Sequence, residues 1–429
     1  MDTTTAAHQP PAPVHDAVDD WRGLGDLIEL ATQRLSAPVE GAHHTIADGW
    51  FHVAGHSGST WHTAHRAATK NLYGSVRMAG SIARVSLDIG ATTIGNLHRV
   101  RPLWDSRIGA GIRAAANALW GDEFERSSSP MHTELSIRHA TGTPVTTDPV
   151  TLSLTFEKPT SRLAVLLHGL GKTERCWNPK TTDDGNRNGL PNMLEADGFT
   201  PVLVRYNSGR RVSDNGEALA ALLEEITQNW PTPVDEIVLI GHSMGGLIAR
   251  SALYAGRSAN HDWIDSANHL VALATPHFGS PIEKGAHVAS ELLTTAAATR
   301  SLGEFIDGRS AGIKDMRHGT IHSTGHSEHP EISEGNHGEA APPIKGIRQH
   351  HAVGVVTDSA SHPLGFLVGD LVVRVNSATG VSSTGHVDSA NVRVFGGLDH
   401  LGLLHDASVH TQIREWLTPI GPTPTETTP

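Results

Sequence analysis

Residues 236–256, EIVLIGHSMGGLIARSALYAG, carry the strongest structural signal in this chain of 429 residues. The first residues are apolar, as in a buried strand, and apolar residues return at helical spacing after residue 244. Between strand and helix lies Gly241-His242-Ser243-Met244-Gly245, which has the form G-x-S-x-G. A strand that turns at once into a helix strains the central residue and leaves no room for side chains on either side of it. The pattern therefore predicts a serine hydroxyl held at the end of a strand.

The position of this serine also suits chemistry. A helix N-terminus favours negative charge that develops beside it, as happens when a nucleophile attacks a carbonyl group. The alternative is a glycine-rich helix start with an incidental serine. The strand before the motif and the helix after it favour the first interpretation, so Ser243 is the predicted nucleophile.

A second glycine turn supports this interpretation. Residues 162–169, RLAVLLHG, form an apolar run that ends in His-Gly. A hydrolase needs backbone N–H groups that hold the oxyanion formed during attack. Leu170, directly after His-Gly, and Met244, directly after the serine, are the predicted donors, both through the main chain. A plain strand-to-loop turn is the alternative at the first of these positions.

Short apolar or alternating runs predict the strands of one sheet. Helical patterns, such as residues 216–230, separate several of them, which indicates a parallel sheet covered on both faces. Two alternating runs, 133–139 and 150–156, flank a turn-rich segment and predict a hairpin. The later runs are 162–169, 200–207, 236–243, 269–276, 351–358 and 392–397.

The start and end of the chain differ from this pattern. Residues 1–20 are rich in Pro, Thr and Asp and are expected to be disordered, as is the tail 419–429. Residues 21–125 form a helical region by the spacing of their apolar residues. Because an amphipathic helix must bury its apolar stripe, we expect this region to dock on the rest of the chain. A membrane-surface role is the alternative, since Arg77 and Arg84 lie among apolar residues.

Composition limits the class of protein. Hydrophobic residues make up 38% of the chain and charged residues 18%, as in a globular protein. The net charge of −12 argues against a nucleic-acid-binding surface. Cys176 is the one cysteine, so an intrachain disulfide is excluded. There is no signal-peptide pattern and no apolar run that approaches about 18 residues, so we expect a cytoplasmic protein without a transmembrane segment. Nothing in the sequence sets the oligomeric state.

Several motifs follow one another in a distinctive order. They are His-Gly at 168–169, YNSG at 206–209, GHSMGG at 241–246, TPHFGSP at 275–281, GDLVV at 369–373 and HLGLL at 400–404. With them, residues 160–418 resemble the α/β-hydrolase superfamily. Within it, the chain is most similar to the lipase and esterase group, which includes bacterial triacylglycerol lipases and GPI inositol-deacylase-like hydrolases.

The resemblance implies an α/β-hydrolase fold, with a mostly parallel central sheet flanked by helices. This domain would span residues 130–418 and carry the N-terminal helical region as an extension. Residues 283–349 include a long polar stretch and lie where such lipases often place a lid, so an insertion of that kind is expected there.

The resemblance also implies the partners of the serine, because the superfamily runs Ser, then acid, then His along the chain. Asp370 resembles the acid of small bacterial lipases. Asp358 is its rival, because it directly ends a predicted strand. His400, which precedes a Leu-rich run and a final helix, fits the base better than His405 or His410.

The function implied is hydrolysis of carboxylic esters that have a lipid-like or short acyl part, without a cofactor. His400 would take the proton of Ser243, Asp370 would orient His400, and the amides of Leu170 and Met244 would hold the oxyanion. A thioesterase or acyltransferase with the same residues is one rival, and a GPI inositol-deacylase-like enzyme is a second. A non-enzymatic interaction protein is the third, but no residue of the triad is missing from the sequence.

Two patterns resemble metal sites, and each has a simpler explanation. Residues 184–195 match an EF-hand loop in their ligands, but no helix precedes them and Pro191 interrupts the loop. His322, His326 and His329 lie close together, but glycine and proline among them argue against a helix that would align them. We therefore expect polar loops and no bound metal.

Overall fold

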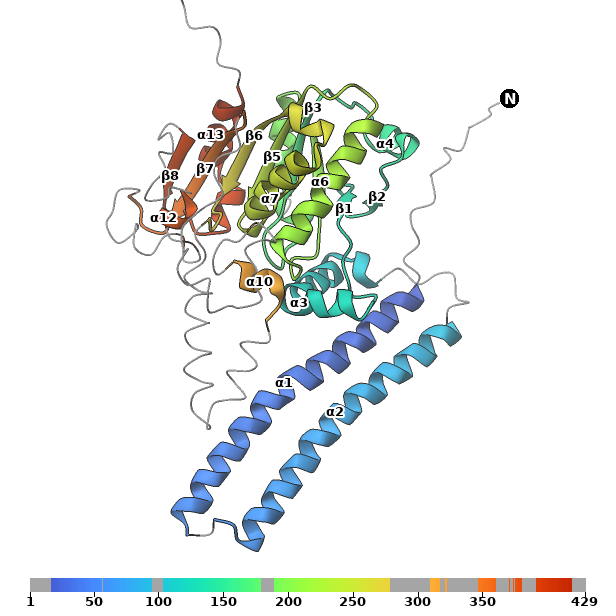
Figure 1. Ribbon diagram of the computed structural model, residues 1–429, viewed down its shortest axis with the longest axis vertical. Helices are drawn as coiled ribbons and strands as arrows, with labels where there is room; N and C mark the ends of the chain where they lie inside the picture. The colour runs from blue at the N-terminus through green and yellow to red at the C-terminus, as the bar shows by residue number, and fades with distance from the viewer. Residues whose placement is uncertain are drawn as a thin grey trace, which may run out of the picture.

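In the part of the chain that the structure describes, eight strands form one sheet, and a long helical hairpin extends from one end of the body (Figure 1). This computed structural model describes residues 17–55, 57–94, 103–178, 189–277, 309–316, 321, 346–359, 370, 373, 375–379 and 391–418. Most of the expected insertion 283–349 lies outside these ranges, as do residues 184–188 and the three histidines at 322, 326 and 329.

The sheet has the strand order β2-β1-β4-β3-β5-β6-β7-β8. β1 pairs antiparallel with β2 and β4, and all the other pairs are parallel. The strands are β1 Ser136–Arg138, β2 Pro144–Val145, β3 Arg162–Leu167, β4 Thr200–Arg205, β5 Glu236–His242, β6 Ala267–Leu273, β7 Arg348–Val355 and β8 Val392–Gly396. The six later strands overlap the six later runs predicted from the sequence, and the expected α/β class is confirmed.

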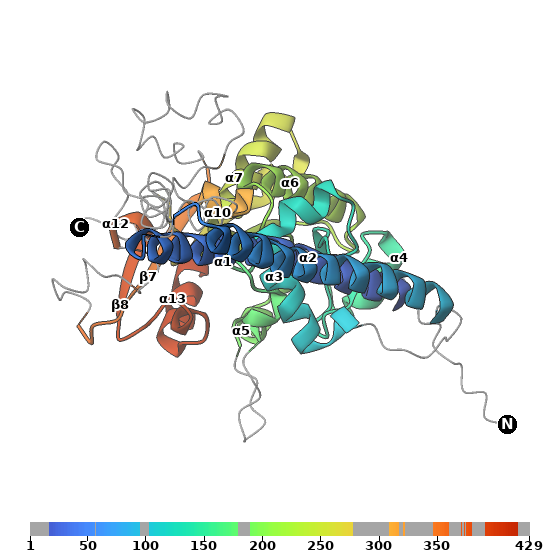
Figure 2. The ribbon, with the colours of Figure 1, turned by 90° about the horizontal axis from the view of Figure 1, so that it is seen from below.

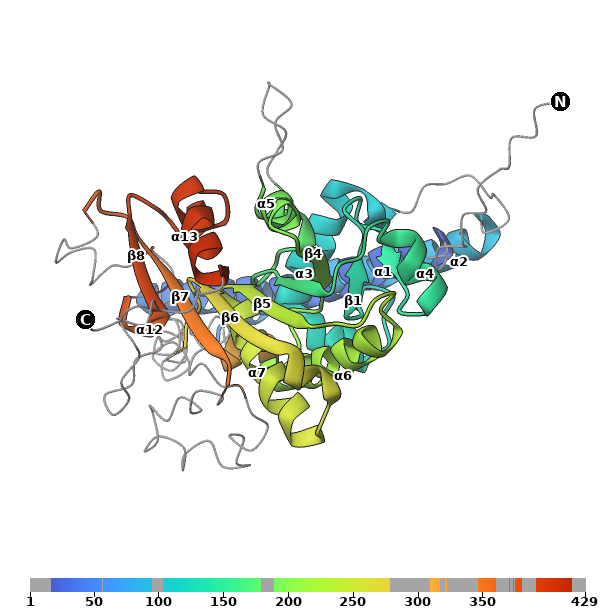
Figure 3. The same cartoon turned by 90° about the horizontal axis from the view of Figure 1, so that it is seen from above.

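Helices cover both faces of this sheet. The α-helices are α1 Ala17–Val53, α2 Thr60–Ile94, α3 Arg107–Arg126, α4 Pro149–Thr155, α5 Leu190–Ala196, α6 Val212–Asn229, α7 Met244–Ala259, α10 Ala311–Asp315, α12 Val375–Ala378 and α13 Ala407–Leu417. Short 3-10 helices are η1 Leu103–Asp105, η2 Glu174–Trp177, η3 Asp262–Ser266 and η7 Gly402–Leu404. Seen from above, α6 and α7 lie on one face, and α5 and α13 lie on the other (Figure 3).

Side chains that point alternately to the two faces of the sheet form the two layers of the core. In β3, Leu163, Val165 and Leu167 belong to the cluster that includes α6 and α7. Ala164 and Leu166 belong to the cluster that includes α5 and α13. Successive side chains of a strand point to opposite faces, so a strand buried on both sides must be apolar throughout.

One predicted strand is wrong. Residues 150–156 form most of helix α4 rather than the second strand of a hairpin, and the partner of β1 is the shorter segment Pro144–Val145. The side chain of Asp148 caps the helix by accepting a hydrogen bond from the Thr151 N–H at 2.9 Å, and Pro149 occupies the first turn. An Asp-Pro start is a strong helix signal, and here it outweighs the alternating pattern that follows it.

The N-terminal helices dock on the body only in part. Residues 17–20 belong to α1, so they are ordered, contrary to expectation. Leu24, Leu27 and Leu30 of α1 pack with Trp120 and Phe124 of α3. Beyond this contact α1 and α2 run side by side away from the sheet (Figure 1), and Figure 2 shows them crossing beneath the body. The expected helical layer on the core is therefore found for α3 and the first part of α1.

None of the helices in the described part of the chain carries an apolar stretch of the length that a bilayer requires.

Candidate active site

Ser243 lies at the sharp turn between β5 and α7. Its backbone angles are φ 54° and ψ −123°, a strained conformation for a residue with a side chain. Its N–H donates to the Leu273 carbonyl of β6 at 2.8 Å, which holds the turn against the sheet. A Cβ atom on Gly241 would collide with the backbone of α7, and one on Gly245 would collide with the backbone at the end of β3. Packing thus requires glycine at both flanking positions of the motif.

Asp370, which is buried, forms a pair with His400, which is partly buried. Nδ1 of His400 lies 2.7 Å from Oδ2 of Asp370, and the N–H of His400 donates to the Asp370 carbonyl at 3.2 Å. The other carboxylate oxygen accepts a hydrogen bond from the Val373 N–H at 2.7 Å. The carboxylate is therefore held from two sides, and it orients the His400 ring so that Nε2 is left for other contacts.

The rival acid lies elsewhere. Asp358 follows β7, its side chain is exposed, and it lies near Gly397. The structure thus brings Asp370 and not Asp358 against His400.

His242 connects the His400 loop to the serine turn. Nε2 of His242 donates to the His400 carbonyl at 2.8 Å, and the two rings are 4.7 Å apart between centroids. Burial lowers the pKa of His242 to about 3, so this ring is neutral and acts as a hydrogen-bond donor at neutral pH. His242 immediately precedes Ser243, so this hydrogen bond links the His400 loop to the serine turn. No pattern in the sequence marked His242 for this role.

The turn after β3 approaches the serine closely. A Cβ atom on Gly169 would lie 3.2 Å from Cβ of Ser243, so a side chain there would crowd the serine. Gly171 has φ 64°, and its N–H donates to Ser208 Oγ at 3.1 Å. Leu170 lies between these glycines, and its N–H therefore belongs to a turn that adjoins Ser243. The Met244 N–H is one of the first in α7, and such groups have no partner within their own helix.

The segment after β4, which carries the YNSG motif, holds this turn in place. The ring of Tyr206 stacks on His168 at 4.1 Å, and its hydroxyl donates to the His168 carbonyl. Burial lowers the pKa of His168 to about 4. This histidine is therefore a neutral structural residue rather than a second base. Arg205 forms a buried bidentate ion pair with Glu174 just beyond the turn, with both N–O distances 2.6 Å.

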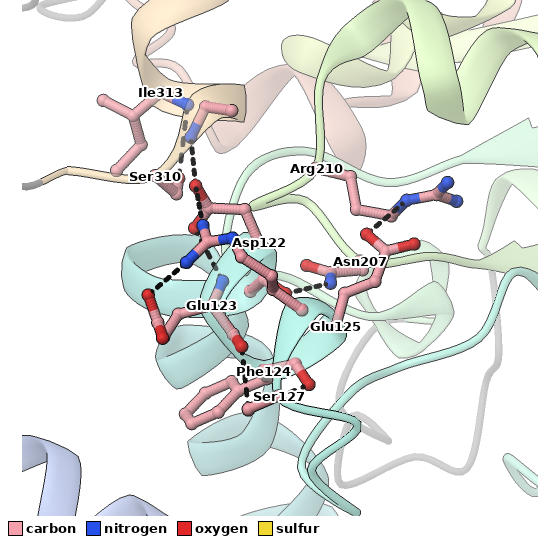
Figure 4. Close-up of polar contacts among 12 residues, drawn as sticks. Asp122, Glu123, Phe124, Glu125, Ser127, Asn207, Arg210, Ser310 and Ile313 are labelled. Carbon is pink, nitrogen blue, oxygen red and sulfur yellow. Dashed lines mark hydrogen bonds and ion pairs between the residues drawn. The ribbon is translucent and has the colours of Figure 1, made fainter.

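α3 and α10 pack together beside the segment after β4 that carries Asn207 and Arg210 (Figure 4). Asn207 Nδ2 donates to the Gly121 carbonyl of α3 at 2.8 Å, and Ser310 Oγ donates to the Ala118 carbonyl of α3 at 2.6 Å. A Cβ atom on Gly312 of α10 would lie 2.9 Å from the terminal methyl of Met244. The described part of the expected insertion thus packs over the residue that follows the serine.

A cluster of buried basic side chains lies just after β6 and within β7, and the abundance of histidine is the only sign of it in the sequence. His277 and His351 have ring centroids 4.9 Å apart, and Arg250 of α7 lies 3.4 Å from His277. Burial lowers the pKa of His351 to about 3 and holds that of His277 well below its usual range. Both rings are therefore neutral at neutral pH.

The other histidines near the end of the chain have structural positions. His405 ends η7, immediately before Asp406, the N-cap residue of α13. His410 lies in that helix and is buried, and its Nε2 donates to the Leu404 carbonyl at 3.0 Å. Within the described ranges, no three His, Cys, Asp or Glu side chains are grouped as metal ligands would be.

The mostly parallel sheet, the helices on both of its faces and the sharp serine turn between β5 and α7 agree with the α/β-hydrolase fold expected from the sequence. Residues 204–319 match the family model described as the PGAP1-like alpha/beta domain. The matched segment covers β4 to α10 and includes Ser243; it is shorter than the range 160–418 over which the motifs resemble the superfamily.

Several solved structures are similar to this chain. The mature lipase BlEst2 of Bacillus licheniformis is 19% identical, with 61% of this chain and 94% of that one covered and a TM-score of 0.40. Lipase 1 of Pelosinus fermentans is 13% identical, with 61% and 99% covered and a TM-score of 0.37. The Staphylococcus hyicus lipase is 15% identical, with 61% and 96% covered and a TM-score of 0.34. No curated protein sequence matches the chain. Similarity this distant carries no argument about activity.

Proposed function

We propose that this protein is a serine hydrolase that cleaves carboxylic esters with Ser243 as nucleophile, His400 as base and Asp370 as the residue that orients the base. The contact of 2.7 Å between His400 Nδ1 and the buried carboxylate of Asp370, joined to the strained serine turn by the hydrogen bond from His242, is the observation that carries the proposal. The contact between Asp370 and His400, and the hydrogen bond from His242, the residue before Ser243, to the His400 carbonyl, support a nucleophile, a base and an acid in these roles.

The proposed reaction has two stages. Ser243 Oγ attacks the ester carbonyl carbon while His400 Nε2 takes the hydroxyl proton, and the N–H groups of Leu170 and Met244 stabilise the oxyanion. The tetrahedral intermediate then collapses, and the alcohol leaves with the proton from His400. Water attacks the acyl-enzyme by the same route, His400 takes its proton, and the carboxylic acid is released as the serine recovers its proton.

The residues on either side of the serine support an acyl group of low polarity. Met244 is fully buried beside α10, and the ring of His242 is neutral because burial lowers its pKa. Neutral neighbours of this kind disfavour a charged acyl group, because that group would lose its water without gaining a counter-charge from them. We therefore propose lipid-like or short-chain esters as the substrate class.

The family match favours a second candidate with the same residues. Since residues 204–319 match a PGAP1-like domain, a GPI inositol-deacylase-like activity on lipid-linked sugars is the alternative to a general esterase. The bond cleaved would again be a carboxylic ester, and the nucleophile would again be Ser243. Comparing acylated inositol lipids with simple esters separates the two.

The test is hydrolysis of p-nitrophenyl esters of increasing chain length by the full chain. Ser243→Ala should lower kcat by about four orders of magnitude or more, and covalent labelling by a fluorophosphonate should disappear. Ser153→Ala, at an exposed position of α4, is the matched control and should keep both properties. Continued labelling of Ser243→Ala would show that another residue is the nucleophile.

A further inference from the structure

The turn that follows β3 holds Leu170 between two peptide groups. The Lys172 N–H donates to the Gly169 carbonyl at 3.2 Å and closes the turn over residues 169–172. Gly171, the third residue of the turn, has φ 64°, as a type II turn requires. Turns of this size can change type by rotation of a peptide group, because the types differ mainly in two backbone angles. Contacts from outside the turn therefore decide where its N–H groups point.

The side chain of His168 fixes the first of these peptide groups. The Tyr206 N–H donates to His168 Nε2 at 3.3 Å, so Nε2 is an acceptor and the ring proton lies on Nδ1. Nδ1 therefore donates to the Gly169 carbonyl, which lies 2.9 Å away. The ring is fully buried and stacks on the ring of Tyr206, with an angle of 2° between the two planes. Because burial lowers the pKa of His168 to about 4, the ring keeps this neutral form at neutral pH.

The direction of the Leu170 N–H follows from this contact. The Gly169 carbonyl and the Leu170 N–H belong to one trans peptide group, which is planar, so the two bonds point in opposite directions. Two donors, His168 Nδ1 and the Lys172 N–H, bind the carbonyl and hold this group in place. The Leu170 N–H consequently points away from the His168 ring. Within the described part of the chain it donates to no other residue, so it can bind an oxyanion.

Ser208 holds the second peptide group. Its side chain is buried, and its Oγ accepts a hydrogen bond from the Gly171 N–H at 3.1 Å. This N–H belongs to the peptide group that joins Leu170 to Gly171, which is the group that rotates when a type II turn becomes a type I turn. Ser208 itself is fixed, because the neighbouring Asn207 donates to the Gly121 carbonyl at 2.8 Å. Side chains from outside the turn thus hold the peptide groups on both sides of Leu170.

We propose that His168 and Ser208 are positioning residues that aim the Leu170 N–H at the oxyanion formed on attack by Ser243. Both act through backbone groups of the turn rather than on the substrate. The turn adjoins the serine, because a Cβ atom on Gly169 would lie 3.2 Å from Cβ of Ser243. A preorganised donor stabilises the oxyanion more than the ester carbonyl that precedes it, so the effect falls on kcat rather than on KM. This inference rests on the proposed function, because it requires the oxyanion of ester cleavage.

Two substitutions of His168 separate its two hydrogen bonds. Glutamine places an amide near Nε2 and can still accept from the Tyr206 N–H, whereas asparagine places an amide near Nδ1 and can still donate to the Gly169 carbonyl. In the full chain, with a soluble p-nitrophenyl ester, His168→Gln should lower kcat by about 10–100-fold with little change in KM. His168→Asn should lose less than about five-fold, although it leaves the larger cavity and should melt at a lower temperature. A merely structural role would make the loss of kcat follow the loss of stability instead.

Ser208→Ala tests the second peptide group. It should lower kcat by about ten-fold and weaken inhibition by phenylboronic acid by a similar factor, because this inhibitor forms a tetrahedral adduct with the serine. Ser213→Ala, at another buried serine, whose Oγ bonds to Asp214, is the matched control and should keep both values. The stoichiometry of fluorophosphonate labelling gives the fraction of active chain, so each kcat is expressed per labelled site.

Two results would overturn the proposal: equal losses of kcat in the two His168 variants, or an unchanged kcat in Ser208→Ala. If the His168 variants do not fold, the result for Ser208→Ala decides alone. Failure of the proposed function looks different, because the unaltered chain would then neither hydrolyse esters nor be labelled at Ser243.

Discussion

The backbone of Ser243 is strained, and its neighbours maintain that strain. A non-glycine residue at φ 54° is disfavoured by roughly 1–3 kcal/mol. The hydrogen bond from its N–H to Leu273, and the direct packing of Gly241 and Gly245 against backbone, leave the turn no relaxed alternative. The side chain is thereby held at the end of β5, next to the residue that bonds to the His400 carbonyl.

The acid of the proposed triad can be tested by a pair of substitutions. Asp370→Asn keeps the size of the side chain but removes the charge that stabilises protonated His400, so kcat should fall by about four orders of magnitude. Asp358→Asn alters an exposed side chain that lies away from His400 and should change kcat less than about two-fold. Measured rates on a soluble ester compare the two. The reverse ranking would mean that His400 pairs with Asp358 in the working enzyme.

At the scale of elements, the joint between β5 and α7 depends on close backbone packing. α7 begins one residue after Ser243, so its first turn lies directly against the end of β3. Gly245 occupies this contact, and a methyl group there would meet the carbonyl oxygens of Leu167 and His168. The same turn supplies the Met244 N–H, so a shift of α7 alters the proposed oxyanion site as well as the fold.

Gly245→Ala should therefore lower stability and activity together. We expect a loss of about 1–3 kcal/mol in the free energy of unfolding, as for overpacked sites, and a larger relative loss of kcat. Gly74→Ala in α2 is the control, because a Cβ atom there has nothing within 4 Å. That change should be neutral or should stabilise the helix by up to about 1 kcal/mol. Urea unfolding and ester hydrolysis give both quantities, and full activity in Gly245→Ala would show that α7 can move without loss of the site.

For the whole molecule, buried histidines link stability to pH. Burial lowers the pKa of His168 and His350 to about 4 and that of His242, His269 and His351 to about 3, with His277 well below its usual range. In the unfolded chain each has a pKa near 6.5. Between about pH 6.5 and pH 4 the unfolded state thus binds protons that the folded state does not. These histidines therefore favour folding above about pH 6.5 and lose that effect as the pH falls towards 4.

We therefore expect the melting temperature to be nearly constant from pH 8 to 7 and to fall steeply below about pH 6.5. Each such histidine contributes up to about 1.4 kcal/mol per pH unit to the slope of the unfolding free energy. Replacing one of them, as in His351→Gln, should reduce the slope of the unfolding free energy against pH, below about pH 6.5, by up to about 1.4 kcal/mol per pH unit. Melting curves followed by circular dichroism measure this, and a flat profile down to pH 4 would mean that the histidines are protonated within the fold.

The local features of this protein follow from its sequence alone. The six later strands are apolar runs of the right length, and the strained serine turn follows from G-x-S-x-G between a strand and a helix. Both depend on neighbours within about ten residues, where strand alternation and glycine sterics act directly. The pairing of Asp370 with His400 was expected from a resemblance in motif order, and spacing alone left Asp358 open.

Only the tertiary structure decided how these pieces meet. Asp370 lies against His400 because both follow neighbouring strands of one parallel sheet, whose ends gather distant loops at the same edge. Residues 150–156 became a helix because the cap at Asp148 outweighed alternation. The apolar stripes of α1 and α2 were visible in the sequence, but which side faced the partner helix was not. Ion pairs such as Arg77–Glu40 join the two helices, and large apolar side chains such as Trp50 and Ile82 are left exposed.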